Sequence, residues 1–439
     1  MKHSPLLGPR MATVAVLFAS LALFCGCLKS DPPRFRANLA LFEKARPKKP
    51  EPAEGEDRGS DAFKSRLTVY GEQIEELEAN IQTVVNYTEA MFGTPDAPRV
   101  LAESGLNAER ILLASGPVNL DGIGKQQGLF RRHCVHCHSV TGDGMGPTAA
   151  FLNPYPRNFR KGWFKFKSTE RNEMPTTLST FEKQADGKLK EIVPNDLKRT
   201  LLEGIPGTAM PSFRTLPSSE LDALVEYVKY LSLRGQIEER LFLQLAEAIN
   251  EKERNKTLAR SNLLAMLEGL ASKWNDAPKH IIDPPEPPKM ALAESIERGR
   301  DLFYSFKTFS AKGADCFTCH GTEALGDGTK EPDEWNKLFN KHPRYEEFVD
   351  KGLILPSRDQ PPRNLRQGVF RGGRRPIDIY RRLHAGIPGV AMPGLVSAGA
   401  QTLTSDQIWH LVHFVRNLQY EPVSESGKRK LPTNERQRN

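Results

Sequence analysis

The feature that most constrains this chain is a five-residue pattern, Cys-x-x-Cys-His, that occurs twice. The copies are Cys134-Val135-His136-Cys137-His138 and Cys316-Phe317-Thr318-Cys319-His320. Two cysteines three positions apart lie on neighbouring faces of a helical turn, so both thiols can reach one edge of a flat ring while the next residue projects toward its centre. This spacing is typical of covalent attachment of a c-type haem, with the thiols on the porphyrin edge and the histidine on the iron.

Two other interpretations exist, because C-x-x-C alone is shared by redox dithiols and zinc sites. Redox dithiols of the thioredoxin type lack the adjacent histidine, and a zinc knuckle needs its four ligands closer together. The complete pattern also recurs in matching surroundings. We therefore predict two covalently bound haem c groups, with His138 and His320 as iron ligands. The thiols that attach them are those of Cys134, Cys137, Cys316 and Cys319.

The surroundings of the two motifs form an internal repeat. The shared segments are Gly-Asp-Gly at 142–144 and 326–328, Pro-Arg-Asn at 156–158 and 362–364, and Gly-Ile-Pro-Gly-x-Ala-Met-Pro at 204–211 and 386–393. Each copy ends in a helix with one apolar stripe. Capping boxes are predicted to begin these two helices, Ser219 with Asp222 and Thr404 with Gln407.

The two copies differ in where extra chain is inserted. The first carries it between Phe166 and Asp196, and the second between Thr329 and Pro361. Because loops on a rigid scaffold commonly carry function, we expect these insertions to determine partner specificity.

Each half resembles a small, mostly helical class I cytochrome c domain, similar to modules of bacterial mono- and dihaem electron-transfer subunits. The resemblance covers about residues 119 to 235 and 291 to 422. It implies a distal methionine on a proline-marked loop between the haem motif and the C-terminal helix, a position matched by Met210 and Met392. A thioether favours ferrous iron, so His/Met ligation would hold both potentials high and would close the iron to substrates.

Other residues compete for the distal position, because a methionine is more often core filler than a ligand. The nearby candidates are Met145, Met174, His133, His136 and His384. Only Met210 and Met392 share a frame in the repeat, and a flanking proline suits a rigid loop. We expect His133 and His136 to be exposed or on the propionate side, and His384 stays an alternative ligand.

Arg157 and Arg363 lie in the two Pro-Arg-Asn segments. A guanidinium fork matches a carboxylate, so these residues are candidates to bind haem propionates. The alternative is an ordinary surface cation in a turn.

The two remaining cysteines, Cys25 and Cys27, end an apolar run that follows Lys2 and Arg10. The run is short for a membrane span and has the length of a signal-peptide core. Residues 23–27 resemble the lipobox of a bacterial lipoprotein, which implies a lipid on Cys27. The sequence departs from the usual lipobox, so an uncleaved anchor and cleavage to a soluble protein stay open. All three outcomes place the haems on the exported, periplasmic side of a bacterial membrane.

The segments without a haem motif are predicted from composition and periodicity. The polar, proline-rich chain after Cys27 predicts a flexible tether. Apolar residues spaced three and four apart from Tyr70 to Met91 predict a helix that packs on the first haem domain, or alternatively docks a partner subunit. Apolar stripes at 237–249 and 263–270 predict a helical linker that ends at the proline-rich residues 283–288.

The predicted fold is therefore mostly α: two tandem class I cytochrome c domains joined by a helical linker, with an N-terminal tether and helix. The predicted parts are a signal peptide (1–26), a lipid-anchored tether plus helix (27–118), the first domain (119–235), the linker (236–290), the second domain (291–425) and a polar tail (426–439).

The formal net charge is +8, and loss of residues 1–26 would leave +6. Basic and acidic residues are interleaved, which argues against a nucleic-acid partner. Basic residues near the first motif predict a basic rim that would attract an acidic redox partner. They are Arg131, Arg132, Arg157, Arg160, Lys161, Lys165 and Lys167.

The predicted function is one-electron transfer, from a quinol-oxidising complex or dehydrogenase to a terminal oxidase or reductase. This function needs no catalytic residue and no small-molecule substrate, so the chain is predicted not to be an enzyme. One alternative is a dihaem enzyme, a peroxidase or sulfur-compound dehydrogenase with one labile haem ligand. Another is a fixed cytochrome subunit of a membrane respiratory complex.

Overall fold

The computed structural model describes residues 32–119, 125–183, 189–193, 195–304, 314–332, 344–397, 400–401 and 403–423. The predicted signal peptide, Cys25, Cys27 and the polar tail 426–439 lie outside the described residues. The chain divides into two units, 1–34 and 35–439, and all helices and strands of the described ranges belong to the second.

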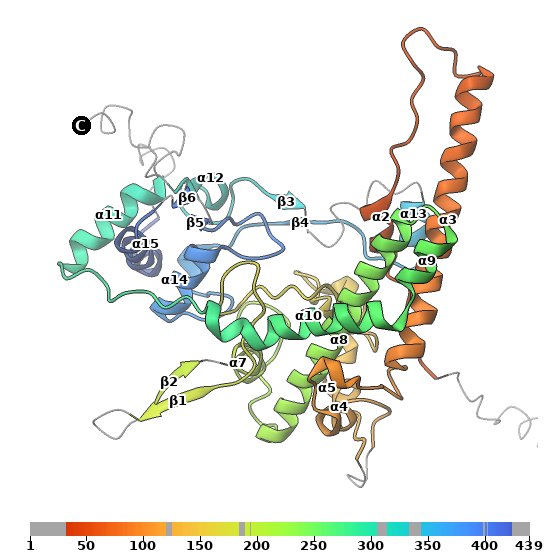
Figure 1. Cartoon of the computed structure of the whole chain (residues 1–439). Helices are drawn as coiled ribbons and strands as arrows, with labels where there is room; N and C mark the ends of the chain where they lie inside the picture. Colours follow the sequence, from red (N-terminus) through yellow and green to blue (C-terminus); the bar gives the residue numbers. More distant parts are fainter. Residues whose placement is uncertain are drawn as a thin grey trace, which may run out of the picture. The chain divides into compact units, whose positions relative to one another are not determined.

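The described chain is mostly helical, which confirms the predicted fold class (Figure 1). The helices are α2 (Phe42–Ala45), α3 (Asp61–Phe92), α4 (Ala108–Ala114), α5 (Leu129–His133), α6 (Val135–His138), α7 (Asp196–Glu203), α8 (Ser218–Glu247), α9 (Glu251–Thr257), α10 (Arg260–Asp276), α11 (Leu292–Tyr304), α12 (Cys316–His320), α13 (Tyr345–Asp350), α14 (Pro376–Ala385) and α15 (Ser405–Asn417). Short 3-10 turns include η1 (Leu39–Leu41), η4 (Phe159–Lys161) and η7 (Leu365–Gln367). The described strands form antiparallel pairs, β1 (Thr180–Lys183) with β2 (Leu189–Val193), β3 (Glu331–Pro332) with β4 (Asp359–Gln360), and β5 (Val396–Ser397) with β6 (Ala400–Gln401). None of the helices in these described ranges combines the length and the apolar character needed to cross a bilayer.

Helix α8 is the central element of the first domain. Its apolar stripe, predicted up to Leu231, is continuous with the stripe predicted for the linker, and Leu231, Leu241 and Leu245 are all buried. The boundary predicted at 235 therefore falls inside one helix. Gly235 is needed there because a Cβ atom would lie 2.3 Å from the Arg160 carbonyl oxygen, so the backbone of η4 packs directly on α8.

The two C-terminal helices begin differently. Thr404 and Gln407 form the predicted capping box at the start of α15. The box predicted for α8 is wrong: the cap position is Pro217, so Ser219 is already inside the helix. Asp222 accepts a hydrogen bond from the Lys198 ammonium instead, at 2.6 Å.

A crossing of α11 and α15 forms the core of the second domain. Gly299 allows the contact, because a Cβ atom there would lie 2.0 Å from the His410 carbonyl oxygen. The rings of Phe303 and Phe414 pack edge to face beside it, with centroids 5.3 Å apart.

The first domain includes a helix that precedes its predicted start at residue 119, because α4 packs on α8.

Residues 35–45 pack into the core, so the prediction of a flexible tether is wrong for this part. Phe35, Leu41 and Phe42 are buried in the apolar cluster that contains α8. The Phe35 ring also lies 3.6 Å from the Arg234 guanidinium carbon, a cation–π contact. The segment after Cys27 is mostly polar, which is why a tether was predicted. Its few large apolar side chains are nevertheless buried against the core, and this contact orders residues 35–45.

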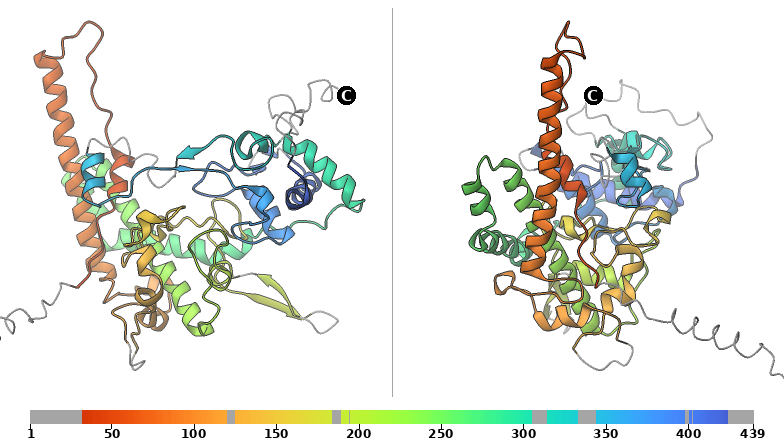
Figure 2. Two further views of the ribbon diagram at one scale, coloured as in Figure 1. Left: turned by 180° about the vertical axis from the view of Figure 1, so that it is seen from behind. Right: turned by 90° about the vertical axis from the view of Figure 1, so that its right-hand side faces the viewer.

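The second half of α3 packs on α8, with Leu77, Ile81 and Val84 buried. Its first half lies clear of the helices around the second half in both views of Figure 2. Val69, in this first half, is 49 % exposed.

A buried ion cluster links the N-terminal segment, α3, η4 and α8. Both Arg160 and Arg234 donate hydrogen bonds to the Glu238 carboxylate, with Arg160 Nε to Oε2 at 3.1 Å and Arg234 Nη1 to Oε1 at 2.6 Å. Arg234 also donates to the hydroxyl of Thr88, the polar break in the α3 stripe. Arg160 donates to the carbonyl of Arg36 as well. Arg160 was predicted to belong to an exposed basic rim, and this prediction is wrong because Glu238 holds it inside the core.

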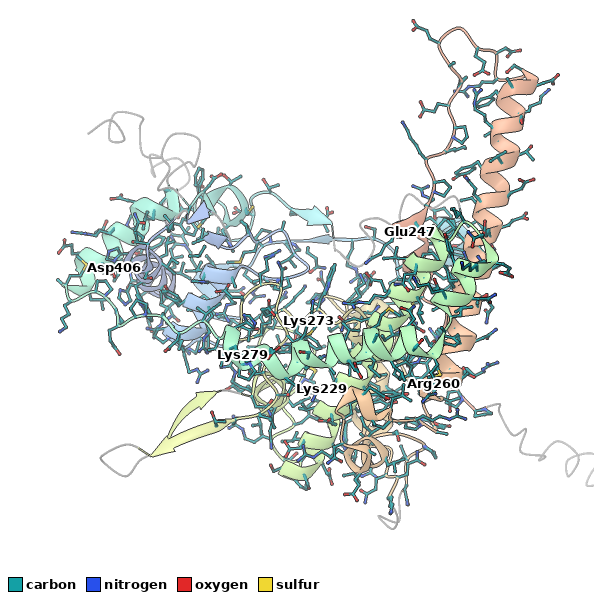
Figure 3. All side chains as sticks on the ribbon, viewed as in Figure 1. Lys229, Glu247, Arg260, Lys273, Lys279 and Asp406 are labelled. Atoms are coloured by element: carbon teal, nitrogen blue, oxygen red, sulfur yellow. The ribbon has the colours of Figure 1, made fainter. Side chains whose placement is uncertain are left out.

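The linker helix α10 packs along α8 with Leu263, Leu267 and Leu270 buried, as the apolar stripe predicts. At this contact the ammonium of Lys229, labelled in Figure 3, lies 5.9 Å from the centre of the Trp274 ring.

The insertion of the second domain contacts elements far away in the sequence. Phe348 and Ile354 pack with Leu39 and Ala40 of η1. Close by, the Tyr155 hydroxyl donates to the Pro356 carbonyl at 2.9 Å. Within the chain, this insertion therefore connects the second domain to the first and to η1. The insertion of the first domain forms the hairpin β1–β2.

We predict that Glu238→Gln lowers the free energy of unfolding by about 3–5 kcal/mol, because Arg160 and Arg234 would keep buried charges without a compensating carboxylate. Glu239→Gln is the matched control: Glu239 pairs with Lys44 at the surface, so its loss should cost less than about 1 kcal/mol. Urea unfolding followed by circular dichroism measures both. Equal stabilities of the two variants would contradict the structural role of the cluster.

Candidate haem sites

Each motif forms one short helical turn, α6 and α12. The turn ends directly after the histidine, because Ser139 and Gly321 take positive φ values of 64° and 80°. All four motif cysteines are thiols that are not joined in disulfides. Burial raises the pKa of the Cys134 thiol to about 12, which keeps it protonated.

The backbone of each Pro-Arg-Asn segment orients a motif histidine. His138 Nδ1 lies 2.9 Å from the Arg157 carbonyl oxygen, and His320 Nδ1 lies 3.0 Å from that of Arg363. A carbonyl only accepts, so Nδ1 donates and Nε2 keeps its lone pair for a metal. Burial lowers the pKa of His138 to about 4 and also lowers that of His320, so both rings are neutral at pH 7. Sequence reasoning assigned these segments a role through their arginine side chains and missed this role of their carbonyls.

The hydrogen bonds also correct the register of the repeat. Gly144 N–H donates to the His138 carbonyl at 3.0 Å, and Gly326 N–H donates to that of His320 at 2.8 Å. Gly144 therefore corresponds to Gly326, and Gly142 to Ala324. The alignment of the two Gly-Asp-Gly triplets was therefore wrong by two residues. The hydrogen bond to the histidine carbonyl, and not the triplet, defines which positions are equivalent.

The two methionine loops, residues 204–211 and 386–393, share one conformation. Ile205 N–H donates to the Met210 carbonyl, and Ile387 N–H to the Met392 carbonyl, both at 3.1 Å. Gly204 has a φ of 66°, and a Cβ atom there would lie 2.7 Å from the Pro211 carbonyl carbon, so only glycine fits.

The side chains of both methionines are half-buried. Met210 packs against the same apolar cluster as Cys134, and Met392 against the same cluster as Cys316. Each methionine therefore packs on the same apolar core as a motif cysteine of its own domain.

The competing ligand candidates have other surroundings. His384 Nε2 lies 3.0 Å from a carboxylate oxygen of Glu170. Met174 is buried in the first core, and Met145 packs beside Tyr155. His133 is half-buried, and its ring packs edge to face with that of Phe213. His136 is exposed.

The Arg157 and Arg363 side chains are both half-buried. Arg363 Nη2 donates to the Val369 carbonyl, and its Nε is buried without an acceptor among the residues described. Burial lowers the pKa of this guanidinium. The Arg363 guanidinium, whose backbone carbonyl accepts the hydrogen bond of His320, can therefore donate to a carboxylate. Together with two thiols, a neutral imidazole and a thioether, it fits haem c.

The predicted basic rim is reduced by internal contacts. Arg131 pairs with Asp96. Lys167 donates to the carbonyls of Glu170 and Glu173, and burial lowers its pKa to about 8. Lys161 lies over the Trp163 ring at 5.7 Å.

A search of family models found that residues 124–232 match the cytochrome c family. This part of the chain is similar to a cytochrome c domain. The match supports covalently bound haem c and haem-based electron transfer. It lies within the first domain and contains the first motif and Met210.

No curated protein matches the chain. Among solved structures, a chain of the reducing HAO-like protein complex of Kuenenia stuttgartiensis matches with a TM-score of 0.40 and 21 % sequence identity. The match covers 69 % of this chain and 97 % of that chain, and similarity of this size does not indicate a shared function.

We predict that Gly146→Ala and Gly328→Ala reduce haem attachment at the first and second motif, respectively. A Cβ atom at Gly146 would lie 2.3 Å from the His136 carbonyl oxygen, and one at Gly328 2.4 Å from that of Thr318. Either methyl group would displace the turn that carries the thiols. Haem per chain, measured by the pyridine haemochrome assay, checks the prediction.

Gly269→Ala is the control, because nothing lies within 4 Å of a Cβ atom at that exposed helical position. It should keep full haem content and stabilise α10 by up to about 1 kcal/mol. Full haem content in Gly146→Ala would contradict the proposed fit of the turn.

Proposed function

We propose that this chain is a dihaem c-type cytochrome that transfers single electrons between respiratory-chain components in the bacterial cell envelope. The observation that supports a second haem is the repetition of the site. The second motif has the same histidine-to-carbonyl bond and the same methionine-loop turn as the motif inside the cytochrome c domain. Two unrelated Cys-x-x-Cys-His sequences would not share both contacts.

In each site the residues of the chain hold and orient the cofactor. The two cysteines would bind the ring edge, the motif histidine one face of the iron, and Met210 or Met392 the other face. Haem iron, when bound, alternates between its ferric and ferrous states. The Arg157 and Arg363 carbonyls hold the imidazoles in the tautomer that leaves Nε2 for the iron.

Occupation of both faces of the iron leaves no position for a substrate, so this arrangement favours electron transfer over the dihaem-enzyme alternative. We assign no catalytic residue. The partners are redox proteins: a quinol-oxidising complex or dehydrogenase as donor, and a terminal oxidase or reductase as acceptor.

One observation favours the role of a fixed subunit of a larger complex. The first half of α3 exposes Val69 and lies clear of the helices around its second half. This half of α3 lies beside Lys48 and Pro50 of the N-terminal segment, and its exposed side suits a partner subunit. A lipid on Cys27 would keep both proteins at one membrane.

We predict two haem c groups per chain, each with histidine and methionine ligands. Oxidised protein should show the methionine-to-iron charge-transfer band at an intensity for two irons, and the reduced protein should bind little carbon monoxide. Met210→Leu and Met392→Leu should each remove about half of this band, because each removes one thioether of two. Absorption and magnetic circular dichroism spectra measure the effect.

Met145→Leu is the matched control, since this methionine lies close to the first motif in sequence and packs beside Tyr155. It should keep the whole band. A high-spin haem that binds carbon monoxide stoichiometrically in the unmodified protein would contradict electron transfer and favour the enzyme alternative.

We also propose that the protein is exported and anchored through a lipid on Cys27. Cys27→Ser, expressed in a bacterium with lipoprotein processing, should move the protein from the membrane to the soluble periplasmic fraction and abolish labelling with a radioactive fatty acid. Cys25→Ser is the control and should stay labelled. Membrane retention of the Cys27→Ser protein would indicate an uncleaved anchor instead.

A further inference from the structure

Two arginines of the second domain, Arg363 and Arg371, meet a methionine loop of the first domain. Arg371 Nη2 lies 3.4 Å from the Gly207 carbonyl oxygen. A Cβ atom at Gly207 would lie 3.1 Å from Arg363 Nη2. Gly207 belongs to the loop that carries Met210, so both guanidinium groups lie against the methionine loop of the first domain.

Each of the two guanidinium groups has a buried Nε without an acceptor among the described residues. No ion pair with a carboxylate is found for Arg363 or Arg371 within the described ranges. Burial, and then the charge of Arg363, lower the pKa of Arg371 to about 10. Two neighbouring half-buried cations repel each other, and an anion between them would offset this cost.

Arg363 also places this pair beside the second haem site. Its carbonyl accepts the hydrogen bond of His320 Nδ1, at 3.0 Å. One residue therefore contacts the proximal ligand of the second site through its backbone and the methionine loop of the first site through its side chain.

The contact between the domains is reciprocal. A Cβ atom at Gly389, the counterpart of Gly207, would lie 3.5 Å from Arg157 Nη1, just as Gly207 faces Arg363. Arg171 of the first domain donates to the Met392 carbonyl at 3.0 Å. Each methionine loop is therefore held by an arginine of the opposite domain, in the manner of an isologous interface.

We propose that Arg363 and Arg371 form an anion site that binds a propionate carboxylate of the haem attached to Cys316 and Cys319, and that this site couples the second haem to the Met210 loop. This inference rests on the proposed function, in which a second haem is attached to the second motif. A carboxylate accepts two parallel hydrogen bonds from a guanidinium, and haem c carries two such groups. The position of Arg363 beside His320 selects the propionate of the second haem rather than of the first.

The site has a measurable consequence for the redox potential. Positive charge near the ring stabilises ferrous over ferric haem, since reduction removes one positive charge from the iron. Arg371→Gln and Arg363→Gln should therefore each lower one of the two midpoint potentials. We expect about a tenfold change in the equilibrium constant of reduction, which is about 59 mV for one electron.

Redox titrations followed by absorption, on the full chain with its haems, measure this shift. Arg371→Lys keeps a cation and should recover most of the potential, and circular dichroism checks that every variant folds. Arg374→Gln is the matched control, because Arg374 is exposed and lies three residues away. Unchanged potentials in folded Arg371→Gln and Arg363→Gln proteins would overturn the inference.

Two further arms test the source of the anion. The Cys316→Ala/Cys319→Ala chain keeps the first haem alone. In this background Arg371→Gln should leave the midpoint potential of the first haem unchanged. A lower potential would assign the bound propionate to the first haem. Inorganic phosphate should not move the potential of the unmodified protein. A phosphate dependence that Arg371→Gln abolishes would mean that the site binds a free anion. A haemochrome assay that finds one haem per chain would refute the proposed function itself, which is distinct from these outcomes.

Discussion

The burial of one arginine after each Pro-Arg-Asn segment is the interaction on which both sites depend. Arg160 is held by Glu238 inside the first core, and Arg157, three residues earlier, accepts the hydrogen bond of His138. In the second domain Arg366 takes the corresponding place and donates to the Glu421 carbonyl at 2.7 Å. The anchored arginine fixes the segment on the C-terminal helix region, and the segment then fixes the imidazole, so core packing determines the tautomer available to the iron.

The same segments connect the two domains. Their arginine side chains extend to the methionine loop of the opposite domain, at Gly207 and Gly389, where the absence of a side chain allows close approach. The insertion of the second domain adds further contacts to η1 and to Tyr155. A displacement of one domain would therefore move the methionine loop of the other. The two proposed haem sites are therefore linked by direct contacts between their domains.

Local patterns predicted local structure well and long-range contacts poorly. The apolar stripes of α8, α10 and α15 and the Thr404 capping box are present, because each depends on residues within a few turns. The chain from Phe35 to Phe42 was predicted as tether because its few apolar residues are diluted by polar neighbours, and only α8 supplies the surface that buries them. The alignment of the two Gly-Asp-Gly triplets was wrong because Gly144 is placed by its hydrogen bond to the His138 carbonyl. Sequence similarity between the two repeats does not show such a bond.

The sequence by itself determined the chemistry: the spacing of thiols and imidazole within one turn, the repeat that places Met210 and Met392 in equivalent loops, and the mostly helical fold. These properties depend on covalent geometry and on periodicity, which are readable along the chain. Tertiary structure alone decided which polar groups are buried and which partners they meet. Arg160 became a core anchor and not a surface cation, and Arg363 reached across to Gly207, because hydrogen bonds and desolvation act between residues that are distant in sequence and adjacent in space.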